Sequence, residues 1–188
     1  MKKRRCIVLS SLTLLLLTAC INKEKLKLSM PTAYNFKIEY LNAINRARSN
    51  NQTCGSKGYF KAAEPLVWND KLYNAAYEHS YDMAISNMFS HKGSGQISDK
   101  TGFIKKSASS GKDRIERYGY SWRIYAENIG AGSNITTAEK AVQGLLNSAG
   151  HCANIMNPKL KEVGMAMVKN SNSKYIYYWT QNFGTPLN

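Results

Sequence analysis

The N-terminal segment divides the chain into a part that is removed and a part that folds. Residues 2–5 are Lys-Lys-Arg-Arg, and the apolar run at 7–17 is too short to span a bilayer as a mature helix. This combination is typical of a secretory signal. The run ends in Leu-Thr-Ala-Cys at 17–20, which resembles a bacterial lipobox. We therefore expect residues 1–19 to be a lipoprotein signal peptide and Cys20 to be the lipidated first residue of the mature chain. The alternative is an ordinary signal peptide that leaves Cys20 free.

The mature part is long enough for one domain. Removing 19 of the 188 residues leaves 169, a length at which a chain buries roughly 70% of its surface around a single core. Residues 20–33 are polar, lysine-rich and interrupted by Pro31, as is typical of a tether. We expect the lipidated cysteine and tether to occupy residues 20–33 and one folded domain to occupy residues 34–188.

The chain is strongly basic. Its 26 Lys and Arg residues against 12 Asp and Glu give a net charge of +14, which falls to +10 when the four basic residues of the signal are removed. Lys23, Lys25 and Lys27 would be attracted to anionic headgroups beside the lipid on Cys20, each by on the order of 1 kcal/mol. The sequence has no Arg/Lys-rich helix and no RNA-binding motif, so nucleic acid is not an expected partner. The expected location is the bacterial cell envelope, lipid-anchored and either periplasmic or surface-exposed.

Cysteine usage predicts one disulfide. Once Cys6 leaves with the signal and Cys20 carries the lipid, Cys54 and Cys152 are the remaining thiols, in a compartment that permits disulfides. A bond between them would close a loop of about 100 residues, and the loop-entropy model predicts that it would stabilise the fold by about 4.7 kcal/mol. It would also fix the position of the neighbouring His151. The alternatives are two unconnected buried cysteines and a nucleophilic pair of Cys152 with His151. The second is disfavoured because adjacent side chains usually point apart.

Two stretches in the N-terminal half have helical periodicity. The first begins at Phe36, ends near Ser49 and has one apolar face. The second follows Asn69 or Asp70, either of which can cap a helix. Its buried stripe consists of Leu72, Ala75, Ala76, His79 and Met83. We expect His79 to face the core with a hydrogen-bonded ring nitrogen.

The C-terminal part contains a helix and a hairpin. Thr136 and Glu139 have capping-box spacing. The helix that follows has an inward face of Ala138, Ala141, Val142, Leu145 and Leu146, and it ends near Asn147. Alternating residues at 163–168, a polar turn and the aromatic run at 175–180 predict a β-hairpin. Two or three helices with a mainly antiparallel sheet predict an α+β fold built as an α-β-α sandwich.

Two segments rich in glycine and polar residues are expected to be loops, residues 52–64 and 90–121, the second with a short helix at 114–118. Loops as long as the second are usually functional or mobile. This second loop lies between two stretches whose histidine and carboxylate side chains are candidate site residues. We therefore expect it to form a wall or lid of a site.

The order and spacing of several short elements resemble the CAP superfamily, the SCP-like domains of cysteine-rich secretory proteins, venom antigens and plant pathogenesis-related proteins. The elements are Asn45-x-x-Arg48, Leu66-Val67-Trp68-Asn69, Glu78-His79-Ser80, Asp82-Met83-Ala84, Ser90-His91, Ala126-Glu127-Asn128-Ile129 and Gly150-His151. The resemblance covers residues 36–185 and is greatest to the bacterial branch. It implies an α-β-α sandwich and structural roles for Asn45 and Arg48.

The resemblance also implies a site. CAP domains carry two histidines and two glutamates around a surface cavity that holds zinc in some members. His91 and His151 match the two histidines, and Glu127 matches one glutamate. Asn147 stands where the second glutamate is expected, and an amide cannot act as a general base. Zinc held by His91, His151 and Glu127 would be weakly bound, and Glu127 would have to serve either as ligand or as catalytic base. The alternative is a hydrogen-bonded cluster of the same three residues without metal.

The expected function is that of a lipid-anchored extracellular binding or interaction module, because the cavity lacks one of the family's carboxylates. Its ligand could be a lipid, a peptide or a host protein. The alternatives are a zinc-dependent hydrolase or peptidase in which Glu127 activates water, and a lipid or sterol carrier. A metal-free serine hydrolase would use Ser90 or Ser148 beside a histidine, but the sequence has no Gly-x-Ser-x-Gly element.

Overall fold

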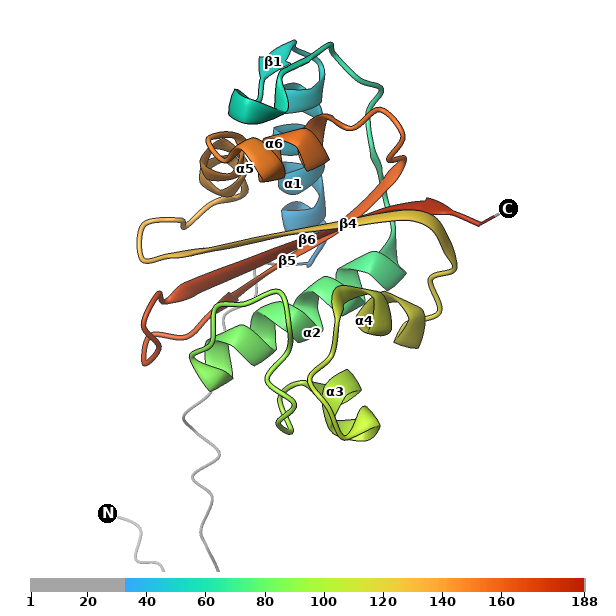
Figure 1. Ribbon diagram of the computed structural model, residues 1–188. Helices are drawn as coiled ribbons and strands as arrows, with labels where there is room; N and C mark the ends of the chain where they lie inside the picture. Colours follow the sequence, from blue (N-terminus) through green and yellow to red (C-terminus); the bar gives the residue numbers. More distant parts are fainter. Residues whose placement is uncertain (1–32, 188) are drawn as a thin grey trace, which may run out of the picture.

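The fold has three layers (Figure 1). The computed structural model describes residues 33–187, so the expected signal peptide, Cys20 and nearly all of the tether lie outside the described residues. The helices are α1 (Ala33–Arg48), α2 (Asp70–Ser86), α3 (Lys100–Lys105), α4 (Gly111–Arg117), α5 (Ala138–Leu146) and α6 (Ala149–Met156). Helices α1, α5 and α6 lie on one face of the sheet, and α2, α3 and α4 lie on the other. The α-β-α arrangement predicted from the sequence is thus confirmed. Within residues 33–187, no helix is both long and apolar enough to cross a bilayer.

The central sheet is mainly antiparallel, as predicted. Its strands are β3 (Val67–Trp68), β5 (Glu162–Lys169), β6 (Tyr177–Pro186) and β4 (Trp122–Gly132), in that spatial order. Strand β3 runs parallel to β5, whereas the β5–β6 and β6–β4 pairs are antiparallel. The predicted hairpin is formed by β5 and β6, although β6 begins at Tyr177, two residues later than expected. Residues Tyr175 and Ile176 instead belong to the connection, where Ile176 has a φ of 67°.

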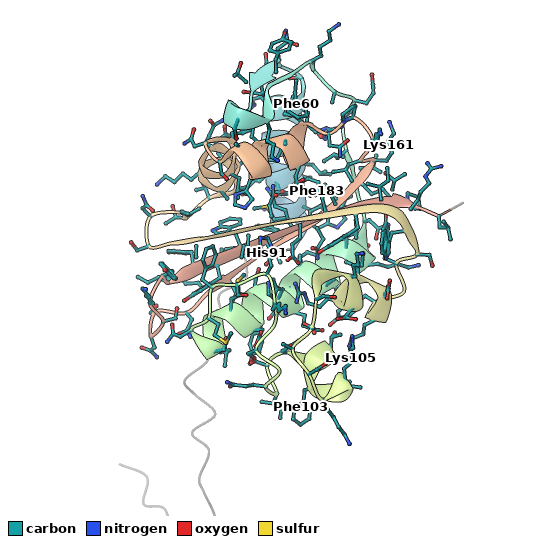
Figure 2. The ribbon with its side chains drawn as sticks, viewed as in Figure 1. Phe60, His91, Phe103, Lys105, Lys161 and Phe183 are labelled. Atoms are coloured by element: carbon teal, nitrogen blue, oxygen red, sulfur yellow. A yellow bond between two sulfur atoms is a disulfide. The ribbon has the colours of Figure 1, made fainter. Side chains whose placement is uncertain are left out.

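The expected loop at 52–64 contains a small second sheet. Strands β1 (Gln52–Thr53) and β2 (Tyr59–Phe60) pair around a short 3-10 helix, η1 (Gly55–Lys57). Figure 2 shows Phe60 at this end of the molecule and Phe183 of β6 within the layered core. The strands are too short for an alternating pattern to be visible in the sequence.

Helix α1 is fixed by the two polar residues for which the family resemblance implied structural roles. Asn45 exchanges two hydrogen bonds with the backbone of Leu66, at 2.8 and 3.0 Å. The fully buried Arg48 donates to the carbonyl oxygens of Glu64, Ile155 and Asn157. Because these carbonyls come from distant segments, the two side chains join α1 to the loop before β3 and to the end of α6.

Helix α2 carries the apolar stripe predicted from its sequence. Asn69 is its N-cap and accepts hydrogen bonds from the backbone nitrogens of Lys71 and Leu72. The helix lies directly on the sheet, because a Cβ atom added to Gly164 of β5 would be 2.0 Å from the backbone nitrogen of Tyr73. His79 is fully buried, as predicted. The predicted ring hydrogen bond was wrong, because neither ring nitrogen has a partner among the described residues.

The region around α5 differs from the prediction in two ways. The Thr136–Glu139 capping box was wrong: Thr137 is the N-cap and accepts from the backbone nitrogen of Lys140 at 3.2 Å. The chain also does not become irregular after Asn147, since α6 begins at Ala149. Helix α6 has only eight residues and contains a glycine near its start, so its periodic signal is weak.

The expected long loop is an ordered segment with two short helices, of which only α4 was predicted. Buried carboxylates organise it. Asp99 accepts hydrogen bonds from the backbone nitrogens of Gly95, Gly102 and Ser109, at 2.9 to 3.0 Å. Asp82 of α2 accepts from the backbone nitrogen of Ser94 and from two serine hydroxyls. The segment is therefore held against α2 and brings α4 beside β4.

Candidate functional site

The three residues named by the resemblance come from three different elements. His91 follows α2, Glu127 lies in β4, and His151 lies in the first turn of α6. The Nδ1 atom of His91 is 2.9 Å from Oε1 of Glu127. Burial and the neighbouring His91 lower the pKa of His151, so that its ring is neutral near pH 7. The His91 side chain is 56% exposed, whereas the Glu127 side chain is nearly enclosed at 5% exposure.

The second oxygen of Glu127 is bound by an arginine that the sequence did not indicate. One guanidinium nitrogen of Arg114 lies 2.7 Å from Oε2, and the arginine side chain is fully buried. Arg114 also donates to the carbonyl oxygen of His91 and to the hydroxyl of Ser109. Helix α4 can approach this closely because Gly111 has no side chain: a Cβ there would be 1.8 Å from the hydroxyl of Tyr125. One arginine among several charged residues of a short helix carries no sequence signal that would distinguish it from a surface charge.

These contacts keep Glu127 ionised. Burial alone would raise the pKa of its carboxyl, but Arg114, His91 and the nearby His79 more than compensate and lower the pKa from 4.5 to about 2. With the side-chain amide of Asn182 oriented to satisfy both of its atoms, its nitrogen donates to Oε2 at 3.2 Å as well. A carboxylate with so low a pKa is a weak base at neutral pH.

His79 lies on the α2 side of the cluster that His91, Glu127 and Arg114 form. Burial is the main reason that its pKa falls from 6.5 to about 4, and the positive charge of Arg114 adds to the effect. The opposing influences of Glu127, Asp82 and the backbone of Ser90 are smaller, and the Ser90 contact lacks hydrogen-bond geometry. His79 is therefore a neutral core residue.

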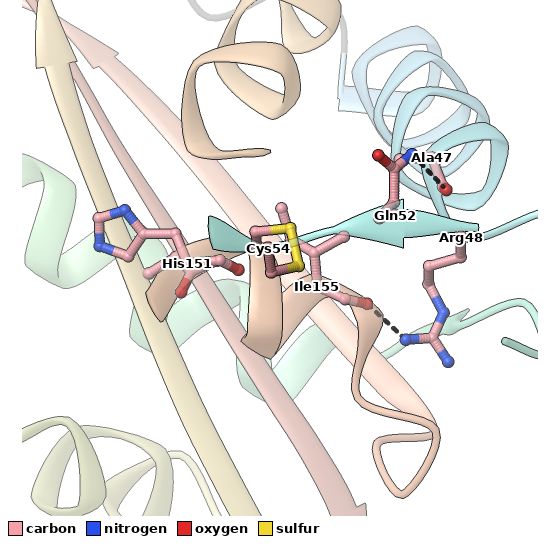
Figure 3. Close-up of a disulfide and its surroundings, with 8 residues drawn as sticks. Ala47, Arg48, Gln52, Cys54, His151 and Ile155 are labelled. Carbon is pink, nitrogen blue, oxygen red and sulfur yellow. Dashed lines mark hydrogen bonds between the residues drawn. A yellow bond between two sulfur atoms is a disulfide. The ribbon is translucent and has the colours of Figure 1, made fainter. Parts of the chain in front are cut away.

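The backbone of His151 is held from two sides. The side-chain nitrogen Nδ2 of Asn128, the residue after Glu127, donates to the carbonyl oxygen of His151 at 3.2 Å. It also donates to Oε1 of Gln181. The predicted disulfide is confirmed: Cys152 of α6 is bonded to Cys54, just before η1, across 98 residues of sequence. Figure 3 shows this bond between His151 and the carbonyl of Ile155 that Arg48 binds. Because the sulfur of Cys152 is in this bond, it is not available as a nucleophile.

The residues present do not fit the zinc site that the resemblance implied. Both oxygens of Glu127 already have cationic or hydrogen-bonding partners, and the buried guanidinium of Arg114 would repel a metal ion at this carboxylate. No group of three His, Cys, Asp or Glu residues within 33–187 is arranged to hold a metal ion. Asn147 is exposed at the C-cap of α5 and supplies no carboxylate. Residues 33–187 therefore lack the ligand set of a three- or four-coordinate zinc centre.

The serine hydrolase alternative also lacks its geometry. The hydroxyl of Ser90 accepts a hydrogen bond from the backbone nitrogen of Lys92. Ser148 precedes α6 as its N-cap, without a side-chain hydrogen bond to the helix. No hydrogen bond among the described residues joins either hydroxyl to a histidine ring, and His91 already has its Nδ1 on Glu127.

A small apolar cavity opens beside the cluster. Its volume is about 230 Å³. The walls come from β4, β6, α5, α6, the segment between β4 and α5, and the residue before Ser90, and His151 is the one titratable residue among them. The lining residues are Phe89, Ile129, Gly130, Ala131, Ile135, Ala141, Gly144, Leu145, His151 and Trp179. The arrangement can enclose an apolar group while a neutral imidazole offers one hydrogen bond.

Sequence comparisons give two bacterial relatives. The uncharacterised protein YkwD of Bacillus subtilis (strain 168) is 29% identical over 120 residues, which are 64% of this chain and 39% of YkwD. The uncharacterised membrane protein YlbC of the same strain is 30% identical over 118 residues, 63% of this chain and 28% of YlbC. The chain thus spans well under half the length of these relatives.

Solved structures with the same fold come from several bacteria. An extracellular protein containing an SCP domain from Bacillus anthracis is 25% identical, with a TM-score of 0.57 over 80% of this chain and 40% of that one. An outer surface protein from Borrelia burgdorferi has a TM-score of 0.61 at 17% identity, over 84% of this chain and 97% of that one. A cysteine-rich secretory protein from Staphylococcus aureus is also 17% identical, with a TM-score of 0.53 over 83% of this chain and 40% of that one.

The profile of the Cysteine-rich secretory protein family matches residues 41–183, which include every residue of the cluster and both cysteines of the disulfide. With the α-β-α fold and the bacterial relatives, this match means that the chain belongs to the cysteine-rich secretory protein (CAP) family.

Proposed function

We propose that this CAP domain is an extracellular binding module whose cavity takes one apolar side chain of a polypeptide ligand. The observation that carries the proposal is the apolar cavity of about 230 Å³ with a neutral histidine in its wall. Sites that enclose a drug-sized molecule are usually about 300–1,000 Å³. The cavity is therefore the right size for a side chain and too small to enclose a sterol or a long acyl chain, which argues against the carrier alternative.

The state of Glu127 supports binding over hydrolysis. A general base should have a pKa near the working pH, whereas the pKa of Glu127 is about 2. Its carboxylate neutralises Arg114 and orients His91, so its role is to hold the loop, α4 and β4 together. The zinc-dependent hydrolase has no observation in its favour beyond the family resemblance.

The location outside the cell is part of the proposal. Relatives with this fold are described as an extracellular protein and an outer surface protein, and a disulfide is expected in such a compartment. We propose that a lipid on Cys20 anchors the domain to the envelope through residues 21–32. In cells fed an alkyne-labelled fatty acid, wild-type chain is expected to carry the label and Cys20→Ser to carry none. Absence of label from the wild-type chain would contradict the anchor.

The binding proposal can be tested by NMR with N-acetyl-L-phenylalaninamide as the probe. A chain starting at residue 21 retains every described element, and its amide signals would be followed during titration. Saturable shifts are expected at Gly130 and Gly144, which line the cavity, with a Kd in the millimolar range that about 0.3 kcal/mol per atom gives for so small a probe. Absence of saturable shifts at these glycines would contradict the proposal.

Gly144→Leu is the blocking variant. A Cβ at Gly144 meets no atom within 4 Å, and the position lines the cavity, so leucine can be added there without a clash and puts a bulky side chain at the cavity wall. Leucine is also the better helix former by roughly 0.8 kcal/mol, so loss of binding would not reflect unfolding. Gly150→Leu is the matched control, since Gly150 has equally open space but does not line the cavity. We expect Gly144→Leu to lose the probe shifts and Gly150→Leu to keep them.

A further inference from the structure

Three large apolar side chains project into solvent from one small part of the fold. Ile97 is 77% exposed, Phe103 is 54% exposed and Ile104 is 62% exposed. They lie in α3 and the turn before it, which we call the α3 tip (residues 97–106). Figure 2 shows Phe103 at the end of the molecule opposite Phe60, well away from the sheet and from His91. These side chains take no part in the core or in the cavity.

The α3 tip is a rigid projection. On its inner side, Thr101 and Gly102 are buried, and the backbone nitrogen of Thr101 donates to Glu78 of α2 at 2.8 Å. Asp99 caps the helix and also accepts from the backbone nitrogens of Gly95 and Ser109. Buried carboxylates thus hold the backbone inward while the apolar side chains point outward. A partner would meet a preformed apolar surface and would not need to order it.

The charge around the tip is positive. Residues 90–117 contain seven Lys and Arg and three Asp and Glu. Two of these ten charges are buried, because Asp99 caps α3 and Arg114 binds Glu127. Lys105 forms an ion pair with Asp113. Lys100 and Lys106 are exposed and have no acidic partner within residues 33–187. The tip therefore combines exposed apolar groups with lysines on a convex surface.

We infer that the α3 tip docks onto an anionic lipid surface, with Phe103 and Ile104 entering the headgroup region and the lysines meeting lipid phosphates. Apolar side chains beside basic ones are the composition by which proteins bind such interfaces. The shape of the tip favours a bilayer over a protein, because a projection fits a deformable planar surface and offers no groove for a protein segment. The inference depends on the proposed location at the envelope, but not on the peptide-binding cavity.

The proposed anchor allows this contact. The 12 residues between Cys20 and Ala33 can span at most about 40 Å when extended, which is comparable to the diameter of a small domain. The domain could therefore rotate on its tether until the tip meets the same membrane. The tip would then set the orientation in which the His91 face is presented.

Vesicle sedimentation tests the inference. The chain starting at residue 21, which carries no lipid, would be mixed with vesicles of phosphatidylcholine and phosphatidylglycerol (7:3) or of phosphatidylcholine alone, in 0.1 M salt. We expect binding to the anionic vesicles, and at least tenfold weaker binding for Phe103→Ser/Ile104→Ser. The matched control is Tyr59→Ser/Val67→Ser, which removes apolar side chains that are 62% and 58% exposed elsewhere. The control should bind like wild type.

The contributions of charge and of insertion can be separated with two further variants, each with a matched control. Lys100→Glu/Lys106→Glu should lose binding to anionic vesicles, whereas Lys57→Glu/Lys61→Glu should lose much less. Phe103→Trp should show a blue-shifted emission component that is quenched by brominated lipids, and Tyr59→Trp should not.

Wild-type levels of binding by the tip variants would overturn the inference and assign membrane affinity to the tether. No binding by the wild type would also overturn it and leave a protein as the occupant of the tip. Neither result would affect the NMR test of the cavity, so failure of one proposal is distinguishable from failure of the other.

Discussion

Replacing Glu127 by glutamine is expected to destabilise the fold strongly, because it leaves the guanidinium of Arg114 buried without its counter-charge. A guanidinium nitrogen of Arg114 lies 2.7 Å from Oε2 of Glu127, and the exposed fractions of the two side chains are 0% and 5%. A carboxyl pKa that falls from 4.5 to about 2 corresponds to about 3 kcal/mol of stability at neutral pH. Breaking one partner of a buried pair typically costs about 3–5 kcal/mol. For a domain of this size the melting temperature should fall by roughly 6–20 °C.

The assay is urea unfolding of wild type and Glu127→Gln at several pH values. Because the carboxyl pKa is depressed in the folded state, its contribution is complete above pH 4.5 and is lost as the pH falls toward 2. Glutamine imitates the protonated carboxyl, so the difference in free energy of unfolding between the two proteins should be largest near pH 7. This difference should be smaller at pH 3. The control is Glu139→Gln, whose exposed ion pair with Arg46 at 3.4 Å should contribute at most about 1 kcal/mol.

Two results would refute this reasoning. One is a Glu127→Gln variant whose free energy of unfolding lies within about 1 kcal/mol of wild type at pH 7. The other is a difference in free energy of unfolding between the two proteins that is the same at pH 7 and pH 3. Either would mean that Glu127 does not hold Arg114 in the fold, and would restore it as a candidate general base.

Three further predictions concern stability. The oxidised protein should show no reactive thiol at Cys54 or Cys152 in denaturant, and replacing both by serine should cost about 2–5 kcal/mol; two reactive thiols without reductant would contradict the disulfide. Because the pKa of His79 falls from 6.5 to about 4, the unfolded state binds its proton first, so stability should decline as the pH falls through that interval. Urea unfolding at pH 7 and pH 5 should show a smaller decline for His79→Phe, and an equal decline would exclude His79 as the cause. Gly164→Ala should destabilise by about 1–3 kcal/mol, because its Cβ would be 2.0 Å from the backbone of α2, whereas Gly150→Ala should not; equal melting temperatures would contradict the close packing.

Elements with a periodic pattern of buried residues were predictable, because that pattern is visible in the local sequence. The stripe that includes Leu72, Ala75 and Met83 identified α2, and the alternation from Val163 to Val168 identified β5. The disulfide could be predicted by elimination, since two thiols remained in the expected mature chain. These predictions needed only the local sequence and the expected compartment.

Strand β4 and the arginine of the site could not be predicted in the same way. Strand β4 contains Glu127 and Asn128, two polar residues in sequence, because one binds Arg114 and the other binds the backbone of α6. Their partners come from distant segments, so the sequence around them has no clear alternation. Arg114 is fully buried because Glu127 lies opposite it, and a pairing of this kind depends on the assembled fold rather than on a local pattern.

The resemblance located the histidines and the glutamate, but not what the glutamate does. Its implication of zinc rested on residue types alone, whereas the chemistry of Glu127 depends on which groups contact its two oxygens. The same holds for the cavity, whose lining comes from β4, β6, α5 and α6 and therefore has no continuous signature in the sequence.

The most direct test of a binding rather than a hydrolytic site is the protonation state of Glu127 itself. Its side-chain carboxyl carbon can be followed by ¹³C NMR during a pH titration of the folded protein. We expect the carboxyl to stay ionised as the pH is lowered to about 3, in keeping with a pKa of about 2. A titration midpoint at or above 4.5 would show that Arg114 does not hold this carboxylate, and would contradict the account of the site.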